Sequence, residues 1–192
     1  AILAGAATAT KSTAGSVTLS GANTYSGNTV VNAGTLTAGN AAAFGTGTVT
    51  VNTGGTVNLG SQTVANAVTV AGGTLSGGTI ALSQVTADSG TISANLSGVG
   101  TALAKSGAGT LTLSGANTFN GGTTVSAGTL IIGANNTLAA TGALTVDGGT
   151  LSLGNFSQLA GAITYASGSI TGGTGVLSGT SFTANATTAV SL

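Results

Sequence analysis

A Gly-Thr/Ser-aliphatic triplet recurs nine times at near-constant spacing along the 192-residue chain. Neighbouring copies lie 17 to 21 residues apart, and most steps are close to 19 residues. The copies begin at Gly15, Gly34, Gly55, Gly73, Gly90, Gly109, Gly128, Gly149 and Gly168. A period this short, with β-forming residues at its centre and no helical pattern between copies, is typical of a solenoid whose turns stack along one axis.

The residues around each triplet alternate between apolar and polar. The residue two positions after each Gly is always aliphatic, as in Val17, Leu36, Val57 and Leu75, and the residues on either side of it are mostly Ser or Thr. Because successive side chains of a strand point to opposite faces, the aliphatic residues are expected to stack in single file inside the coil. This pattern predicts a parallel β-sheet that adds one strand per turn.

About 19 residues accommodate three short strands and three corners, with Gly, Asn and Ser at corners that need a positive φ. Parallel β connections are nearly always right-handed. The predicted fold is therefore all-β, a right-handed parallel β-helix of about ten turns, on the order of 45–50 Å long at about 4.8 Å per turn.

The sequence also contains a longer repeat that spans several turns. Residues 11–36 and 105–130 are identical at 18 of 26 positions and lie 94 residues apart, which is five turns. We interpret 11–104 and 105–192 as two copies, the second one truncated. No linker separates the copies, so residues 1–192 are predicted to form one continuous domain.

The composition excludes several classes of function. The chain has two Lys or Arg, two Asp or Glu, and no His, Cys, Met, Trp or Pro. Without a basic surface, binding to nucleic acid is not expected. No run of 18 apolar residues exists to span a membrane as a helix, and without Cys there is no disulfide framework. Disorder is disfavoured because 41% of the residues are hydrophobic.

The sequence contains no evident set of catalytic residues. Asp88 and Asp147 each precede a triplet Gly by two residues, which places them three turns apart, on the order of 14 Å. Carboxylate pairs of glycosidases lie about 5–9.5 Å apart. Two distant carboxylates do not make a calcium site. The chain has no His or Cys to bind a transition metal. We therefore predict no enzyme activity, no metal site and no cofactor.

The sequence predicts one ion pair. Asp88 lies two residues before Gly90, and Lys105 lies four residues before Gly109 on the next turn. We expect the two side chains to approach within about 8 Å. At the surface such a pair contributes about 0–1 kcal/mol, so its role would be structural.

Two surfaces could bind a ligand. Tyr25, Phe44 and Phe119 share one phase of the repeat; they fit an internal stack or, alternatively, an exposed row that grips carbohydrate. The outward Ser/Thr column fits ordinary strand propensity and hydrogen bonding between neighbours. A remote alternative is an ordered lattice that binds ice.

The segment Lys105–Leu130, with the sequence KSGAGTLTLSGANTFNGGTTVSAGTL, resembles the passenger-associated repeat of autotransporters, also called the autotransporter-associated β-strand repeat. Lys11–Leu36 resembles it too, with Thr13 where Gly is usual. The resemblance implies a right-handed β-helix that is exported to a bacterial cell surface or the extracellular space. It also implies that the repeat is part of a stalk and aids secretion, and it supplies no catalytic residues.

These observations favour a structural role as a stalk, spacer or self-assembling fibre subunit, with an adhesin-type binding module for a surface or glycan as the alternative. The chain begins at Ala1 without Met, as expected for a processed protein or a piece of a longer one. Neither terminal region carries a cluster of charge or Pro, and unprotected strand edges invite pairing. We therefore expect head-to-tail association of identical subunits through the ends of the solenoid.

Overall fold

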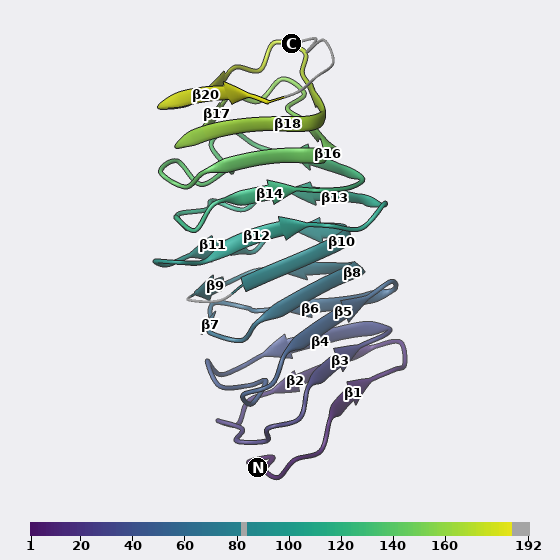
Figure 1. Cartoon of the computed structure of the whole chain (residues 1–192). Helices are drawn as coiled ribbons and strands as arrows, with labels where there is room; N and C mark the ends of the chain where they lie inside the picture. The colour runs from purple at the N-terminus through teal and green to yellow at the C-terminus, as the bar shows by residue number, and fades with distance from the viewer. Residues whose placement is uncertain (82–83, 186–192) are drawn as a thin grey trace.

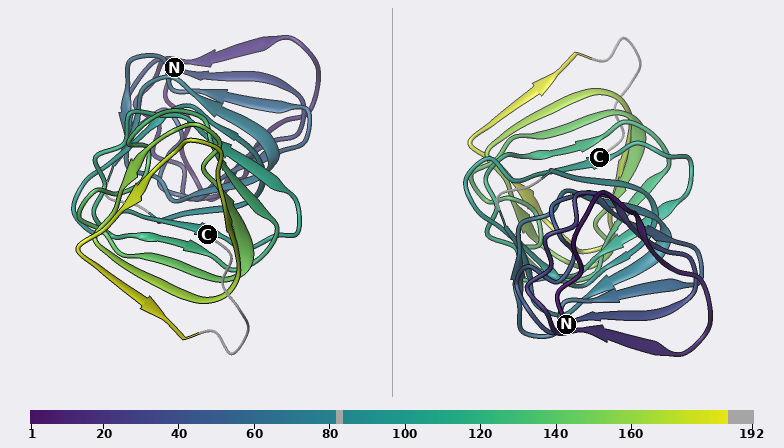
Figure 2. Two further views of the ribbon diagram at one scale, coloured as in Figure 1. Left: turned by 90° about the horizontal axis from the view of Figure 1, so that it is seen from above. Right: turned by 90° about the horizontal axis from the view of Figure 1, so that it is seen from below.

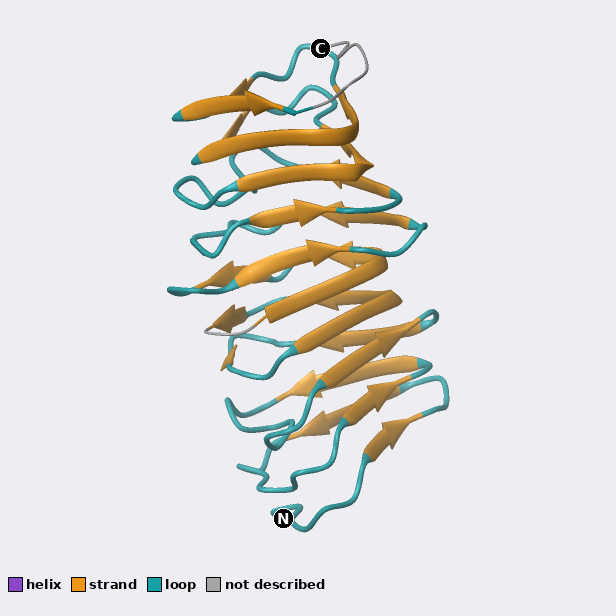
Figure 3. Cartoon of the chain, in the orientation of Figure 1, coloured by secondary structure: helices purple, strands orange, loops and turns teal. Residues whose placement is uncertain are grey.

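The computed structural model of the chain describes residues 1–81 and 84–185, and over these residues it consists of strands and loops without a helix (Figure 3). The strands wind into a right-handed coil of about nine turns, with the N-terminus at one end and residues 181–184 at the other (Figure 1). This is the predicted fold with about one turn fewer than expected. Seen along its length, each turn lies over the preceding one with a progressive twist (Figure 2).

The first wall of the coil is a ladder of parallel strands, one from each turn. In order along the axis it contains β1 (Ala9–Lys11), β3 (Thr29–Val31), β5 (Val49–Asn52), the first part of β8 (Val68–Ser76), the first part of β10 (Gln84–Ile92), β12 (Ala102–Lys105), β14 (Thr123–Val125), the first part of β16 (Leu144–Ser152), the first part of β18 (Ala162–Thr171) and β20 (Ser181–Ala184).

The second wall contains the triplets. Its strands are β2 (Ser16–Leu19), β4 (Gly34–Ala38), β6 (Gly55–Asn58), the second parts of β8 and β10, β13 (Thr110–Leu113), β15 (Thr129–Ile132) and the second parts of β16 and β18. Val17 is the register partner of Leu36, Leu36 of Val57, and Val57 of Leu75. The predicted single file of aliphatic residues is therefore confirmed.

One step of this file departs from the sequence alignment. Ile92 pairs with Leu113, although the alignment of triplets places it next to Leu111. Ala87 pairs with Lys105 and Gly90 with Leu111, so the corner after Lys105 is longer than the bend within β10, and the pairing is shifted by two residues from the alignment of triplets. A shift of two keeps every side chain on its original face, and the apolar core is uninterrupted.

The third wall is less regular. β7 (Thr63–Val64), β9 (Thr79–Ala81) and β11 (Asn95–Ser97) form one small parallel sheet, and β17 (Gln158–Leu159) and β19 (Leu177–Ser178) form another. In the other turns this wall is loop, for example at residues 20–28 and 114–122. Backbone groups there need partners other than a ladder, and side chains supply them.

Candidate functional site

The two lysines of the chain lie at equivalent corners, and both are buried. Lys105 Nζ donates hydrogen bonds to the backbone carbonyls of Gly107 and, at 2.9 Å, Ala127. Lys11 Nζ donates to the carbonyls of Thr13 and, at 3.2 Å, Ala33. Each ammonium therefore joins its own corner to the corner of the next turn.

A glycine 23 residues after each lysine makes room for this arrangement. Gly34 and Gly128 have φ values of +68° and +62°, which favour glycine. A Cβ atom on Gly34 would lie 2.8 Å from Lys11 Nζ. At both glycines the atoms nearest to such a Cβ are backbone carbonyl oxygens of the preceding corner, so the close approach of the two backbones requires glycine.

Asp88 and Lys105 lie on adjacent turns, because Ala87 is the register partner of Lys105. Their expected approach across neighbouring turns agrees with this register, but Lys105 does not lie at the surface as a surface ion pair would require. Asp88 is exposed, whereas Lys105 points inward to carbonyls, and the described residues contain no hydrogen bond between the two side chains. Burial lowers the pKa of the Lys105 ammonium, and the negative charge of Asp88 opposes that shift.

Asparagines of the repeat bridge three consecutive turns. Asn23 Oδ1 accepts from the backbone N–H of Leu3 on the turn before, and its Nδ2 donates to the carbonyl of Ala43 on the turn after. Asn117 makes the same pair of bonds, with Leu96 N and Thr137 O. Each side chain acts as an additional peptide group in the irregular third wall.

Outside the two recognised motifs, other amide side chains also form hydrogen bonds with backbone groups of neighbouring turns. Asn66 Nδ2 lies 2.8 Å from the carbonyl oxygen of Gly47 and 3.1 Å from that of Gly45. Gln158 Oε1 accepts from the N–H groups of Thr137 and Leu138, and its Nε2 donates to the carbonyl of Ala134. Sequence reasoning missed these residues, because their turns contain other amide and hydroxyl side chains that do not mark them out.

The aromatic candidates lie in the core. Tyr25, Phe44 and Phe119 are all buried, which agrees with an internal stack. An exposed row of these rings that grips carbohydrate is therefore wrong, because their faces are covered by neighbouring turns. Tyr25 Oη lies 2.5 Å from Thr29 Oγ1, and burial raises the pKa of the Tyr25 phenol while this hydrogen bond opposes the shift.

The two carboxylates are separated as predicted. Asp88 lies on β10 and Asp147 on β16, and two strands of the first wall, β12 and β14, lie between them. Both are exposed, and each has a serine neighbour on the next turn: Ser106 Oγ is 3.5 Å from Asp88 Oδ1, and Ser167 Oγ is 3.0 Å from Asp147 Oδ1. Residues 1–81 and 84–185 contain no cluster of three potential metal ligands.

The outward polar column is in register but not uniform. Ser16, Thr35, Thr56, Thr74 and Thr91 are successive partners across the second wall. Asn58 interrupts the neighbouring row, and the pairing of Thr91 with Thr112 places Ile131 in the same row as Ser16. The hydroxyl groups are therefore not continuous along either row.

Three segments of the chain, residues 10–38, 103–132 and 127–153, match the family described as the passenger-associated-transport-repeat. These three segments, which cover less than half of the chain, are similar to that repeat. The first two matches contain the motifs at Lys11–Leu36 and Lys105–Leu130, so the resemblance seen in the sequence is confirmed. Comparison with curated proteins and with solved structures gave no match.

The third passenger-associated transport repeat, at residues 127–153, was not recognised from the motif because it has no lysine. Its third wall is held by Gln158 of the following turn, and Leu138 takes the buried position of Tyr25 and Phe119. The repeat thus tolerates different side chains provided that the backbone groups between turns are satisfied. No helix suited to crossing a membrane occurs within the described residues.

Proposed function

We propose that this chain is a structural segment of an extracellular bacterial protein, in which it serves as a stalk or spacer. The passenger-associated transport repeats and the β-solenoid support this proposal. Passengers are the exported parts of autotransporters, as the resemblance of the motif implies, so the expected location is the cell surface or the medium.

The observation that carries the proposal is the use of the buried polar groups. The ammonium groups of Lys11 and Lys105 and the side-chain amides of Asn23 and Asn117 bond to backbone atoms of neighbouring turns. These are the most distinctive residues of the motif, and all of them stabilise the stack instead of facing a ligand. The polar side chains of the repeat therefore support a structural role.

An adhesin-type role would require a different surface from the one first considered. Tyr25, Phe44 and Phe119 are covered by neighbouring turns, so they offer no aromatic platform to a glycan. A passenger with this segment as its stalk would carry any binding residues elsewhere, and we therefore place the stalk role first.

The test is to insert the chain between the outer-membrane anchor of an autotransporter and a distal epitope. We expect the epitope to be displayed and the inserted segment to resist added protease, because its backbone is paired along the ladder. A Gly/Ser-rich linker of equal length is the matched control and should be cleaved rapidly. Retention of the epitope inside the cell, or cleavage as fast as that of the linker, would contradict a stalk.

A further inference from the structure

Three asparagines within the described residues stand in the pattern Asn-x-Ser/Thr, whose asparagine is the acceptor of N-linked sugars. They are Asn95, Asn135 and Asn155, followed two residues later by Ser97, Thr137 and Ser157. All three lie at the corner between the second and third walls, shortly after the triplet strands β10, β15 and β16. One corner of the coil therefore carries the pattern on three turns.

The carbonyl oxygen of each of these side chains joins one turn to the next. Oδ1 of Asn95, Asn135 and Asn155 accepts from a backbone N–H of the following turn, at 2.9, 2.8 and 3.3 Å respectively. Because a backbone N–H can only donate, the atom of the carboxamide that faces it must be the oxygen. The amide nitrogen is then the other atom of the carboxamide.

This amide nitrogen is available in all three side chains. Within residues 1–81 and 84–185, Nδ2 of Asn95, Asn135 and Asn155 donates no hydrogen bond. Asn135 and Asn155 are exposed, and Asn95 is half-buried. A sugar attached to Nδ2 leaves the carbonyl oxygen free to accept, so the hydrogen bond to the next turn is retained.

The asparagines that bridge turns through their nitrogen differ in both respects. Nδ2 of Asn23, Asn66 and Asn117 donates to backbone carbonyls of neighbouring turns, and a sugar on that atom would displace these bonds. None of the three is followed two residues later by Ser or Thr. In the described part of the chain, the pattern thus falls on asparagines whose nitrogen makes no hydrogen bond.

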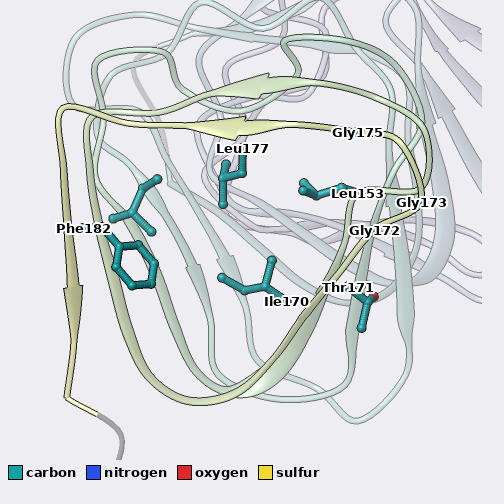
Figure 4. Close-up of a pocket in the computed structure, with 9 residues that line it drawn as sticks. Leu153, Ile170, Thr171, Gly172, Gly173, Gly175, Leu177 and Phe182 are labelled. Atoms are coloured by element: carbon teal, nitrogen blue, oxygen red, sulfur yellow. The ribbon is translucent and has the colours of Figure 1, made fainter. Parts of the chain in front are cut away.

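The corner itself lies on the outside of the coil. The N–H that Asn155 accepts belongs to Thr174, which lies between Gly173 and Gly175. Figure 4 shows the backbone turning the corner at these two glycines, while the side chain of Leu153 projects into the interior. A substituent on the exposed side chain of Asn155 therefore extends into solvent and does not enter the apolar core.

We propose that Asn95, Asn135 and Asn155 are sites of N-linked glycosylation, which places sugars along one edge of the rod. The donor is a nucleotide diphosphate sugar. The new bond joins C1 of the sugar to Nδ2 of the asparagine. The bond between C1 and the phosphate oxygen breaks, the nucleotide diphosphate leaves with its electron pair, and one amide proton passes to a base of the transferase.

The hydroxyl group of one pattern defines when the sugar is added. Thr137 is buried, and its Oγ1 lies 3.3 Å from Oε1 of Gln158 on the next turn. A transferase that reads this hydroxyl must reach it before the next turn stacks on it. Modification therefore precedes complete folding, and the finished coil has to hold the sugar outside.

Sugars at this corner would offset the low charge of the surface. Both lysines are buried, and Asp88 and Asp147 are exposed, so electrostatic repulsion between molecules is small. Bulky hydrophilic sugars keep molecules apart and in solution without any charge. The inference adds a surface modification to the proposed stalk and stands independently of it.

Peptide mapping by mass spectrometry of the protein purified from the cells that produce it tests the assignment. We expect a sugar on Asn95, Asn135 and Asn155 and none on Asn28. Asn28 is exposed and its Oδ1 also accepts from a backbone N–H of the next turn, but Val30 stands where the pattern requires Ser or Thr. Three unmodified sites, or a sugar on Asn28 as well, would overturn the proposal.

Variants produced in the same cells separate the pattern from general reactivity of the amide. Ser157→Ala leaves Asn155 in place but should lower its occupancy at least about tenfold, whereas Ser157→Thr should retain it. Val30→Thr completes the pattern at Asn28 and should create a new site, and threonine suits this half-buried, outward position of β3. Equal occupancy of Asn155 in Ser157→Ala and in wild type would contradict glycosylation through the pattern.

Thermal unfolding tests the geometry of the attachment. The glycosylated protein is compared with the same chain produced in a host without a transferase. We expect nearly equal melting temperatures, because the sugar displaces no hydrogen bond of the coil. A glycosylated chain that fails to fold, or melts far below the unmodified one, would show that Nδ2 does not face solvent. Absence of sugars would leave the stalk proposal intact, because that proposal is tested by protease resistance.

Discussion

The motif at Lys11–Leu36 and the motif at Lys105–Leu130 are nearly the same sequence in two different environments. The first lies at the N-terminal end of the rod and the second in the middle, between complete turns (Figure 1). Lys105, Leu111 and Phe119 are fully enclosed, whereas Val17 is open to solvent on one side. The comparison teaches that the motif specifies which side chains point inward, while the neighbouring turns decide how much that orientation contributes to stability.

The largest expected difference between the two motifs concerns the aliphatic file. Leu111→Ala should lower the free energy of unfolding by about 2–5 kcal/mol, as is usual for a buried leucine. Val17→Ala removes a half-covered side chain and should cost less than about 1 kcal/mol. Urea denaturation of the two variants measures both, and equal losses would show that position along the rod is irrelevant.

The asparagine bridges should give the next largest effect. Asn117→Ala removes two hydrogen bonds and leaves Leu96 N–H and Thr137 O unpaired, so we expect a loss of about 1–3 kcal/mol. Asn23→Ala should cost less, because its lower partner Leu3 lies close to the chain terminus, where fraying relieves the loss. Thermal unfolding provides the comparison, and a larger loss for Asn23→Ala would contradict this ordering.

The aromatic positions allow a gain of stability to be tested. The hydroxyl of Tyr25 bonds to Thr29 in the first motif, whereas Phe119 has no hydroxyl and Thr123 Oγ1 is buried without a hydrogen-bond partner in the described part of the chain. Phe119→Tyr should supply that partner and stabilise the protein by about 0.5–1.5 kcal/mol.

The reciprocal change, Tyr25→Phe, is the matched control for this substitution. It should destabilise by a similar amount, because it leaves Thr29 Oγ1 without its closest partner. Denaturant midpoints of both variants would measure the two effects. If Phe119→Tyr were destabilising, the core beside Thr123 would not accommodate a hydroxyl group and the equivalence of the two corners would fail.

The smallest expected effect is a pH dependence. Burial lowers the pKa of Lys105 in the folded state relative to the unfolded state. The folded state therefore binds this proton less tightly, and the contribution of Lys105 to stability should increase as the pH rises from the folded pKa towards the unfolded value.

This dependence is measured by comparing wild type with Lys105→Met across alkaline pH. The difference in melting temperature should move in favour of wild type as the pH rises. The comparison is necessary because the raised pKa of buried Tyr25 lowers the stability of both proteins as the pH rises above the ordinary pKa of tyrosine, which overlaps the range in which Lys105 acts. A difference that stays constant with pH would show that burial does not act on the Lys105 ammonium.

Much of this fold could be predicted from the sequence because its information is local and repeated. Val17, Leu36, Val57 and Leu75 each follow a glycine by two residues, and alternation along a strand then fixes the inward face. The pairing of Ile92 with Leu113 could not be predicted, since it depends on the length of one corner in three dimensions.

The role of the lysines could not be predicted from the sequence either. A sequence gives no carbonyl directions, so Lys105 was paired with Asp88 by charge, whereas the structure pairs its ammonium with backbone oxygens. Asn66 and Gln158 were missed for the same reason: their partners are main-chain groups of the turns before or after them. Such contacts become visible only when successive turns are stacked.

The ladder of the first wall runs along the axis of the rod, so a pulling force between its two ends would load the backbone hydrogen bonds of successive turns in series. The turns would then detach one after another. Each detached turn of about 19 residues would release roughly 60 Å of extended chain, compared with the rise of about 4.8 Å that it contributed when folded. Under tension, a tether of this design would lengthen in steps and absorb mechanical work before the chain itself was strained.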